Sequence, residues 1–140
     1  MWPHDCAIAA EGLRRYGFRD EAARVAVAVF DAAAAFEFRL PELFGGFPRD
    51  ATDIPIESPH ANRPQAFAAG APLLALRTLL GLDVDAGRLA YALRAAEGVG
   101  EIRVSGLPVR GSRVELVVRA AEDDEHAEER AAAEREQDAA

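Results

Sequence analysis

The chain has 140 residues, of which 50% are hydrophobic and 29% charged, and its formal net charge is −8. This length fits one domain, and the apolar fraction excludes a wholly disordered protein. The acidity is concentrated in residues 121–140, where nine carboxylates stand against two arginines. The other 120 residues are nearly neutral and lack the basic stripe that a phosphate backbone requires, so we expect no nucleic-acid partner.

The cysteine content and the apolar pattern exclude further classes of protein. The single cysteine, Cys6, cannot form an internal disulfide. The longest apolar stretch, residues 66–76, has eleven residues, whereas a membrane-spanning helix needs about 20. The N-terminal residues have neither the basic start nor the hydrophobic region of an export signal. We therefore expect a cytoplasmic protein without membrane contact.

A first helix is predicted over residues 5–16. Asp5 is a typical capping residue, and Gly17 is a typical stop after the last turn. Apolar residues recur at helical spacing along one face, while Glu11, Arg14 and Arg15 lie off it. The residues of this predicted buried face are Cys6, Ala9, Leu13 and Tyr16.

Two more helices are predicted over residues 20–36 and 64–80, and both are apolar on nearly every side. Pro64 suits the first helical position, Pro72 should kink the third helix near Ala68, and Gly81 should end it. Two such helices need cover on most faces, yet the chain offers only one further helix and a hairpin. We expect an incomplete folding unit, or alternatively a homo-oligomer whose copies supply the cover.

The 27 residues from 37 to 63 show no periodicity, and they are too aromatic for a disordered segment. Unstructured stretches of this length in compact domains are usually functional or disordered, so we expect an ordered loop that forms a site. Beyond it, alternation predicts strands at 100–105 and 112–118, joined by a loop at 106–111. Residues 88–94 suit a strand or a helix. The predicted organisation is thus a helical segment at 1–82, a β extension at 83–120 and a solvated acidic tail at 121–140.

Two groups of residues carry candidate chemistry. Glu42 is a loop carboxylate with apolar neighbours, which favour acid–base work by raising a carboxylate pKa; the alternative is a solvated loop glutamate. Trp2, His4 and Asp5 combine an aromatic face, an imidazole and a carboxylate, a set that suits sugar binding. The alternative for Asp5 is a simple helix cap.

Other site types lack their signatures. His4, His60, His126 and Cys6 are too scattered to show a metal-ligand spacing, so no metal is expected. The Gly45-Gly46 pair lacks the lysine and the spacing of a phosphate-binding loop, and no nucleophile motif is present. We expect no cofactor.

Four segments resemble, in order, the C-terminal part of bacterial amylo-α-1,6-glucosidase-type proteins of the glycogen debranching enzyme family. They are residues 2–5 (WPHD), 12–17 (GLRRYG), 40–47 (LPELFGGF) and 64–71 (PQAFAAGA). The resemblance covers residues 2–118. It implies part of an (α/α)6 toroid, in which six helical hairpins form two rings and the active site lies in loops at one end. The first and third helices would belong to the inner ring, followed by a short C-terminal β-hairpin and the acidic tail.

The resemblance also implies roles for individual residues. Glu42 would be the general base of an inverting hydrolysis of α-1,6-glucosidic bonds, a mechanism that requires a carboxylic acid on the other side of the bond. That acid would lie on a barrel segment before Met1, so the chain resembles a fragment that is inactive alone. The residues expected to bind the α-glucan are Trp2, His4, Asp5, Phe47 and Gln65.

The chain departs from the family pattern at two positions: Cys6 replaces a common amide, and Phe67 a common tryptophan. Phe67 keeps a stacking face but lacks the N–H donor. The expected partners are a glucan or oligosaccharide and either the missing barrel segment or further copies of the chain. A non-catalytic carbohydrate-binding module and a helical oligomerisation module remain as alternatives.

Overall fold

A computed structural model describes residues 1–48, 50–85, 88–90, 99–109 and 111–119. They form three helices and two antiparallel pairs of strands, so this part of the chain is mixed and mainly helical, as predicted. A partial toroid stays a prediction, because three helices do not define a ring. The elements are α1 (Pro3–Arg15), α2 (Arg19–Ala35), α3 (Ala66–Leu80), β1 (Asp83–Asp85), β2 (Arg88–Ala90), β3 (Glu101–Val109) and β4 (Ser112–Arg119).

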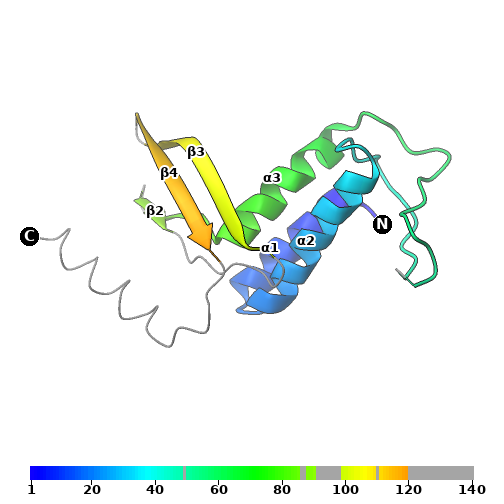
Figure 1. Cartoon of the computed structure of the whole chain (residues 1–140), viewed down its shortest axis with the longest axis horizontal. Coiled ribbons are helices and arrows are strands. Elements are labelled where there is room, and N and C mark those ends of the chain that lie inside the picture. The colour runs from blue at the N-terminus through cyan, green and yellow to red at the C-terminus, as the bar shows by residue number, and fades with distance from the viewer. Residues whose placement is uncertain (49, 86–87, 91–98, 110, 120–140) are drawn as a thin grey trace, which may run out of the picture.

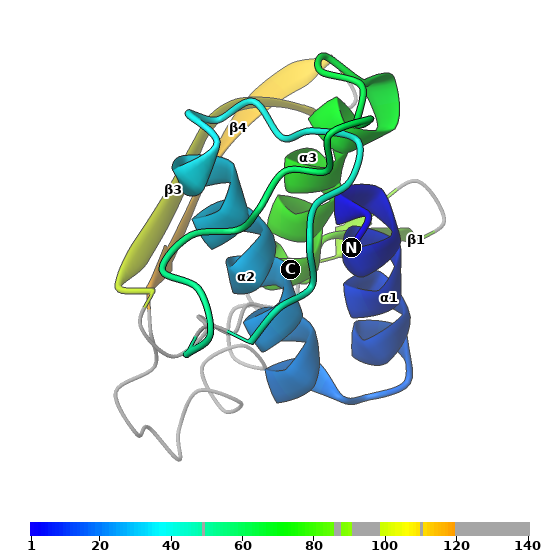
Figure 2. The same cartoon turned by 90° about the vertical axis from the view of Figure 1, so that its right-hand side faces the viewer.

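The three helices pack against one another, and each contacts the other two. Helices α1 and α2 form an antiparallel hairpin, and α3 runs in the same direction as α1 (Figure 1). The first turns of α1 and α3 therefore lie at the same end of the bundle, which the long connection between α2 and α3 crosses (Figure 2). The strand pairs lie toward the other end (Figure 1).

The first helix begins earlier than predicted. Trp2 is its N-cap and Pro3 occupies the first turn, where the missing N–H costs nothing. Asp5 is therefore not the cap. It lies within the first turn, where its charge interacts favourably with the positive end of the helix dipole.

The bounds of the other two helices follow the sequence signals more closely. Helix α2 begins one residue before the predicted start, with Phe18 as its N-cap. Helix α3 begins at Ala66, not Pro64, because the Gln65 side-chain oxygen accepts a hydrogen bond from Ala68 N at 2.7 Å and so caps the helix. Gly81 ends α3 as predicted, with a left-handed φ of 59° that suits glycine.

The core between the helices consists largely of alanine. The side chains that are no more than 3% exposed in the main cluster are all alanines, drawn from all three helices: Ala7, Ala10, Ala26, Ala33, Ala68, Ala71 and Ala75. Small side chains allow helix backbones to approach closely, because the interaxial distance depends on the residues at the contact. Larger apolar residues, among them Phe36, Leu40, Phe44 and Leu79, close this core at its ends.

The predicted apolar face of α1 is buried only in part. Cys6 packs against the core and Leu13 is partly buried, but Ala9 is exposed and Tyr16 is 85% exposed. The buried residues of α1 are Pro3, Ala7, Ala10 and Glu11. Spacing alone did not favour the neighbouring stripe of Ala7 and Ala10, which lies in the helix contact. As a result, large apolar side chains point outward.

Three of these outward side chains lie on α1 and α3. Ile8 is 59% exposed, Phe67 69% and Leu73 72%. This exposure agrees with the expectation that the helices carry more apolar surface than the described chain covers. Helix α2 exposes less apolar surface than expected. Its Val29 is buried, and its Val25, Val27 and Phe30 are partly buried against the core.

A buried carboxylate joins α1 to α3. The sequence pattern placed Glu11 off the buried face, but the residue is only 7% exposed. Its carboxylate accepts hydrogen bonds from Arg14 Nε and Nη2 at 2.8 and 2.7 Å, and from Arg15 Nε at 2.9 Å. Thr78 Oγ1 on α3 donates a further bond at 3.1 Å. The charge is thus paired and fully hydrogen-bonded, which is what burial of a carboxylate requires.

The predicted C-terminal hairpin is present. Strands β3 and β4 pair in register from Glu101↔Arg119 to Val109↔Ser112, with an irregularity between Val104 and Leu107. Residues 106–109, predicted as loop, therefore belong to β3. Residues 88–90 form a strand, whereas residues 91–94 and the tail 121–140 lie outside the described part. Among the described helices, none has the length and apolarity needed to span a bilayer.

The Glu11 network predicts a pH-dependent stability. The hydrogen bonds from Arg14, opposed by burial and aided by Arg15 and Thr78, lower the pKa of Glu11 from 4.5 to about 2. Since the folded state has the lower pKa, the stabilisation is complete above pH 4.5 and is lost as the pH falls toward 2. We expect Glu11→Gln to lower the free energy of unfolding at pH 7 by about 2–3 kcal/mol.

Urea unfolding followed by circular dichroism at pH 7 and pH 3 measures this effect. The difference between wild type and Glu11→Gln should shrink at pH 3. The control is Glu21→Gln, which removes an exposed pair with Arg24 and should cost less than about 0.5 kcal/mol. Equal losses in the two variants would contradict the assignment.

Candidate functional site

The connection between α2 and α3 is tied to the start of α1. Met1 and Phe44 exchange backbone hydrogen bonds: Phe44 N donates to Met1 O at 3.0 Å, and Met1 N donates to Phe44 O. Phe44 also forms an isolated antiparallel bridge with Glu57, and Gly45 N donates to Ile56 O at 2.7 Å. Residues 40–47 are therefore held between the first residues of the chain and residues 56–58.

Glu42 is held by Asn62 at the other end of the same connection. Its Oε2 accepts from Asn62 Nδ2 at 2.6 Å and from Asn62 N at 3.2 Å, and its own N donates to Asn62 O at 2.9 Å. Its apolar neighbours Leu40, Pro41 and Phe44 are buried, while Glu42 stays partly exposed. The Glu42 carboxylate therefore contacts the polar Asn62. The sequence had predicted apolar surroundings for it.

Three aromatic side chains meet at the first turns of α1 and α3. The ring centroids of Trp2 and His4 are 5.5 Å apart at an interplanar angle of 72°, and those of His4 and Phe67 are 5.5 Å apart at 40°. We call Trp2, His4 and Phe67 the aromatic cluster. Trp2 and Phe67 are exposed and the imidazole lies between them, so the cluster offers ring surfaces to solvent on either side of His4.

The polar atoms beside the aromatic cluster differ in their environment. His4 Nε2 is 3.7 Å from Asp5 Oδ1, and Asp5 itself is exposed. His4 Nδ1 is buried and has no hydrogen-bond partner among the described residues. Gln65 lies two residues before Phe67, and its side-chain oxygen is already used to cap α3. Its role as a cap is therefore shown, whereas its role in a binding site stays a prediction.

The structure brings most of the predicted site residues to one end of the bundle. Trp2, His4 and Asp5 begin α1, Gln65 caps the parallel helix α3, and Glu42 is bonded to Asn62, three residues before Gln65. These residues come from three separate segments, so only the tertiary fold collects them. Phe47 is the exception, since it lines a cavity to which none of these residues contributes.

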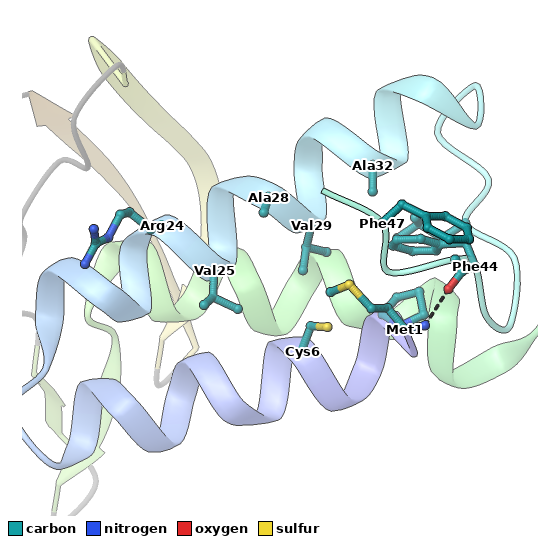
Figure 3. A pocket seen from close by; sticks show the side chains of 12 residues that line it. Met1, Cys6, Arg24, Val25, Ala28, Val29, Ala32, Phe44 and Phe47 are labelled. Carbon is teal, nitrogen blue, oxygen red and sulfur yellow. Dashed lines mark hydrogen bonds between the residues drawn. The ribbon is translucent and has the colours of Figure 1, made fainter. Parts of the chain in front are cut away.

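That cavity is an apolar pocket of about 310 Å³ between α1, α2 and residues 40–47 (Figure 3). Phe47 and Phe44 lie at one end of it, Cys6 lines it from α1, and Val25 and Ala28 line it from α2. The sequence analysis did not predict this pocket. Phe47 therefore belongs to the apolar pocket and not to the aromatic cluster.

The two consecutive glycines permit this closure of the chain on its first residue. A Cβ on Gly45 would lie 2.6 Å from Cε2 of Phe47, and one on Gly46 would lie 2.9 Å from Cγ of Met1. Both distances are shorter than real carbon contacts. The sequence suggested that the two glycines leave the backbone free to approach a ligand; in the structure they make room for the side chains of Phe47 and Met1.

Arg63 and Asn62 are further residues that sequence reasoning missed. Arg63 Nη2 donates to Phe36 O at 2.8 Å, and its guanidinium lies 5.8 Å above the Phe36 ring. Arg63 Nη1 also reaches Glu57 Oε2 at 3.4 Å. The two residues thus fasten the end of the connection to its beginning. No local pattern marks them, because Glu42 is 20 residues from Asn62 and Phe36 is 27 residues from Arg63.

The described residues give little support for a metal site or a reactive thiol. Within the described ranges, no three His, Cys, Asp or Glu side chains are grouped closely enough to hold a metal ion. Burial raises the pKa of the Cys6 thiol, which disfavours the reactive thiolate.

In comparisons with known proteins, no protein-family model matches the chain, and no curated protein sequence matches it. Functional inference therefore depends on the site geometry and on the motif resemblance.

Proposed function

We propose that this chain forms one wall of the glucan-binding site of a debranching-type glycosidase, with Glu42 as the carboxylate that activates water. The observation that carries the proposal is that the aromatic cluster and the Glu42–Asn62 pair both adjoin the first turns of α1 and α3: Phe44 N donates to Met1 O, and Asn62 lies three residues before the α3 cap. The motif resemblance gives roles to Trp2, His4 and Glu42 independently of this geometry. The agreement between the geometry and the motif resemblance supports the proposal.

The chemistry of the aromatic cluster suits a sugar. A pyranose ring has an apolar face that packs on an aromatic ring, and exposed rings such as Trp2 and Phe67 provide this surface. Asp5 beside His4 offers carboxylate oxygens to sugar hydroxyl groups, which donate hydrogen bonds. A neutral oligosaccharide is therefore the class of ligand that this end of the bundle fits best.

Glu42 is suited to the role of a base by the way it is held. Both hydrogen bonds from Asn62 reach Oε2, so Oε1 is the oxygen that would accept a proton from water. An inverting mechanism also needs a carboxylic acid roughly 6.5–9.5 Å away, across the glycosidic bond. The resemblance assigns this acid to a barrel segment before the tryptophan–proline motif. Under the proposal the chain by itself binds glucan but does not hydrolyse it.

Sugar binding can be measured directly, because Trp2 is the single tryptophan of the chain. We expect isomaltose or maltotriose to change the tryptophan fluorescence in a saturable way. Phe67→Ala should weaken this binding roughly three- to tenfold, since it removes one stacking surface. The matched control is Tyr16→Ala, which removes an exposed aromatic ring from the other end of α1. The absence of any saturable change, or an equal loss in the control, would refute the binding role.

The role of Glu42 requires the barrel part that the resemblance places before Trp2. When that part of a debranching-type enzyme is joined to this chain, we expect hydrolysis of α-1,6 linkages. Glu42→Gln should lower kcat by at least about 100-fold, because the amide cannot accept the proton from water. Glu57→Gln, on the same connection, should retain activity. Full activity of Glu42→Gln would remove Glu42 from the mechanism.

A helical association module is the second candidate, and the exposed apolar side chains of α1 and α3 favour it. Ile8, Phe67 and Leu73 are each more than half exposed. Large apolar side chains left exposed on two helices provide contacts that a partner could cover.

Leu73 distinguishes the two candidates, because it lies outside the aromatic cluster. If this face associates, sedimentation velocity should give a defined oligomer that Leu73→Glu converts to a monomer while sugar binding persists. A wild-type chain that stays monomeric at every concentration would exclude self-association.

A further inference from the structure

We propose that the apolar pocket between α1, α2 and residues 40–47 binds a small uncharged aromatic molecule. The pocket is separate from the aromatic cluster, and this inference does not depend on the proposed glycosidase function. It follows from the size of the pocket, the chemistry of its walls and the way in which the backbone holds them (Figure 3).

The size of the pocket suits a small ligand. Its volume is about 310 Å³, at the lower end of the range for ligand-binding pockets. Val25, Ala28, Val29 and Ala32 recur on one face of α2 and form one wall. Two of these four residues are alanines. Because their side chains are small, they leave space beside α2, and this space is part of the pocket. Apolar walls of this kind hold water poorly and accept nonpolar molecules.

The chemistry of the other walls favours an aromatic ring over an aliphatic group of equal size. The rings of Phe44 and Phe47 lie at one end, the side chain of Met1 lies next to them, and the sulfur of Cys6 lies farther along α1 (Figure 3). Phenyl rings form edge-to-face or offset contacts with another ring, and divalent sulfur makes favourable contacts with ring edges. An aliphatic ligand would gain neither interaction.

The walls also disfavour a charged ligand. Two charged groups belong to the described lining: the Arg24 guanidinium, which Figure 3 shows at the end farthest from Phe44 and Phe47, and the Met1 ammonium, which lies beside Phe44. Arg24 Nη2 is bonded to Glu21 Oε1 at 3.2 Å, and Met1 N donates to Phe44 O. A charged group on the ligand would have to compete with these bonds, and burial of a charge without a partner is costly.

Backbone hydrogen bonds hold one wall of the pocket. The backbone exchange between Met1 and Phe44, together with the bond from Gly45 N to Ile56 O at 2.7 Å, fixes the wall opposite α2. Preformed sites bind without the cost of ordering their walls. The loop therefore serves two surfaces: Glu42 on one side and the pocket on the other.

The experiment uses Cys6, the single thiol of the full-length chain, as a reporter inside the pocket. We measure the rate at which monobromobimane labels Cys6 in the presence of phenol, cyclohexanol or benzoate. These probes share a six-membered ring and differ in aromaticity or charge. Phenol should slow labelling at least fivefold in a saturable way, whereas cyclohexanol and benzoate should slow it less than twofold. Equal protection by phenol and cyclohexanol, or no protection by phenol, would overturn the proposal.

Two variants of α2 test whether phenol protects Cys6 by binding in the pocket. Ala28→Phe fills the pocket and should abolish the effect of phenol, while Ala34→Phe, an equal change at an exposed position of the same helix, should leave it unchanged. Protection that persists in a folded Ala28→Phe would also overturn the proposal. If Ala28→Phe fails to fold, Ala28→Val replaces it, because valine fills less of the pocket. The comparison of phenol, cyclohexanol and benzoate on the wild type tests the proposal without any variant.

Discussion

The contact between the alanine faces of α1, α2 and α3 is the interaction on which the rest of the structure depends. Because alanine is the smallest apolar side chain, each residue contributes little area, and the helices gain stability only by approaching closely. The close approach then determines which side chains are left outside. Ile8, Phe67 and Leu73 are exposed because the space between the helices is too narrow for them.

Signals within a few residues predicted the elements well. Gly81 ends α3 through its left-handed backbone, and alternating residues predicted the β3–β4 hairpin. The buried face of α1 was predicted only in part, because spacing did not distinguish Ala9 from Ala7 and Ala10, and because Glu11 finds its partner Thr78 only in the folded chain. The pairing of Glu42 with Asn62 could not be predicted either, since it depends on the path of a long connection.

The first turn of α1 separates two surfaces of different chemistry. Trp2 and His4 lie toward Phe67 of α3, while Met1, Pro3 and Cys6 line the pocket beside α2. One surface combines exposed rings with polar atoms, and the other is almost entirely apolar. The residues of the two surfaces alternate along the sequence, so the same short segment contributes to both.

The backbone exchange between Met1 and Phe44 has a consequence for the order of folding. The α1–α2 hairpin is local and forms at a low entropic cost, whereas α3 must return across a connection of 30 residues, and residues 40–47 can pair with Met1 only once α1 is in place. The surfaces that carry the candidate chemistry therefore assemble last. By the same reasoning they open first when the chain is heated or denatured, so that loss of ligand binding precedes loss of helical structure.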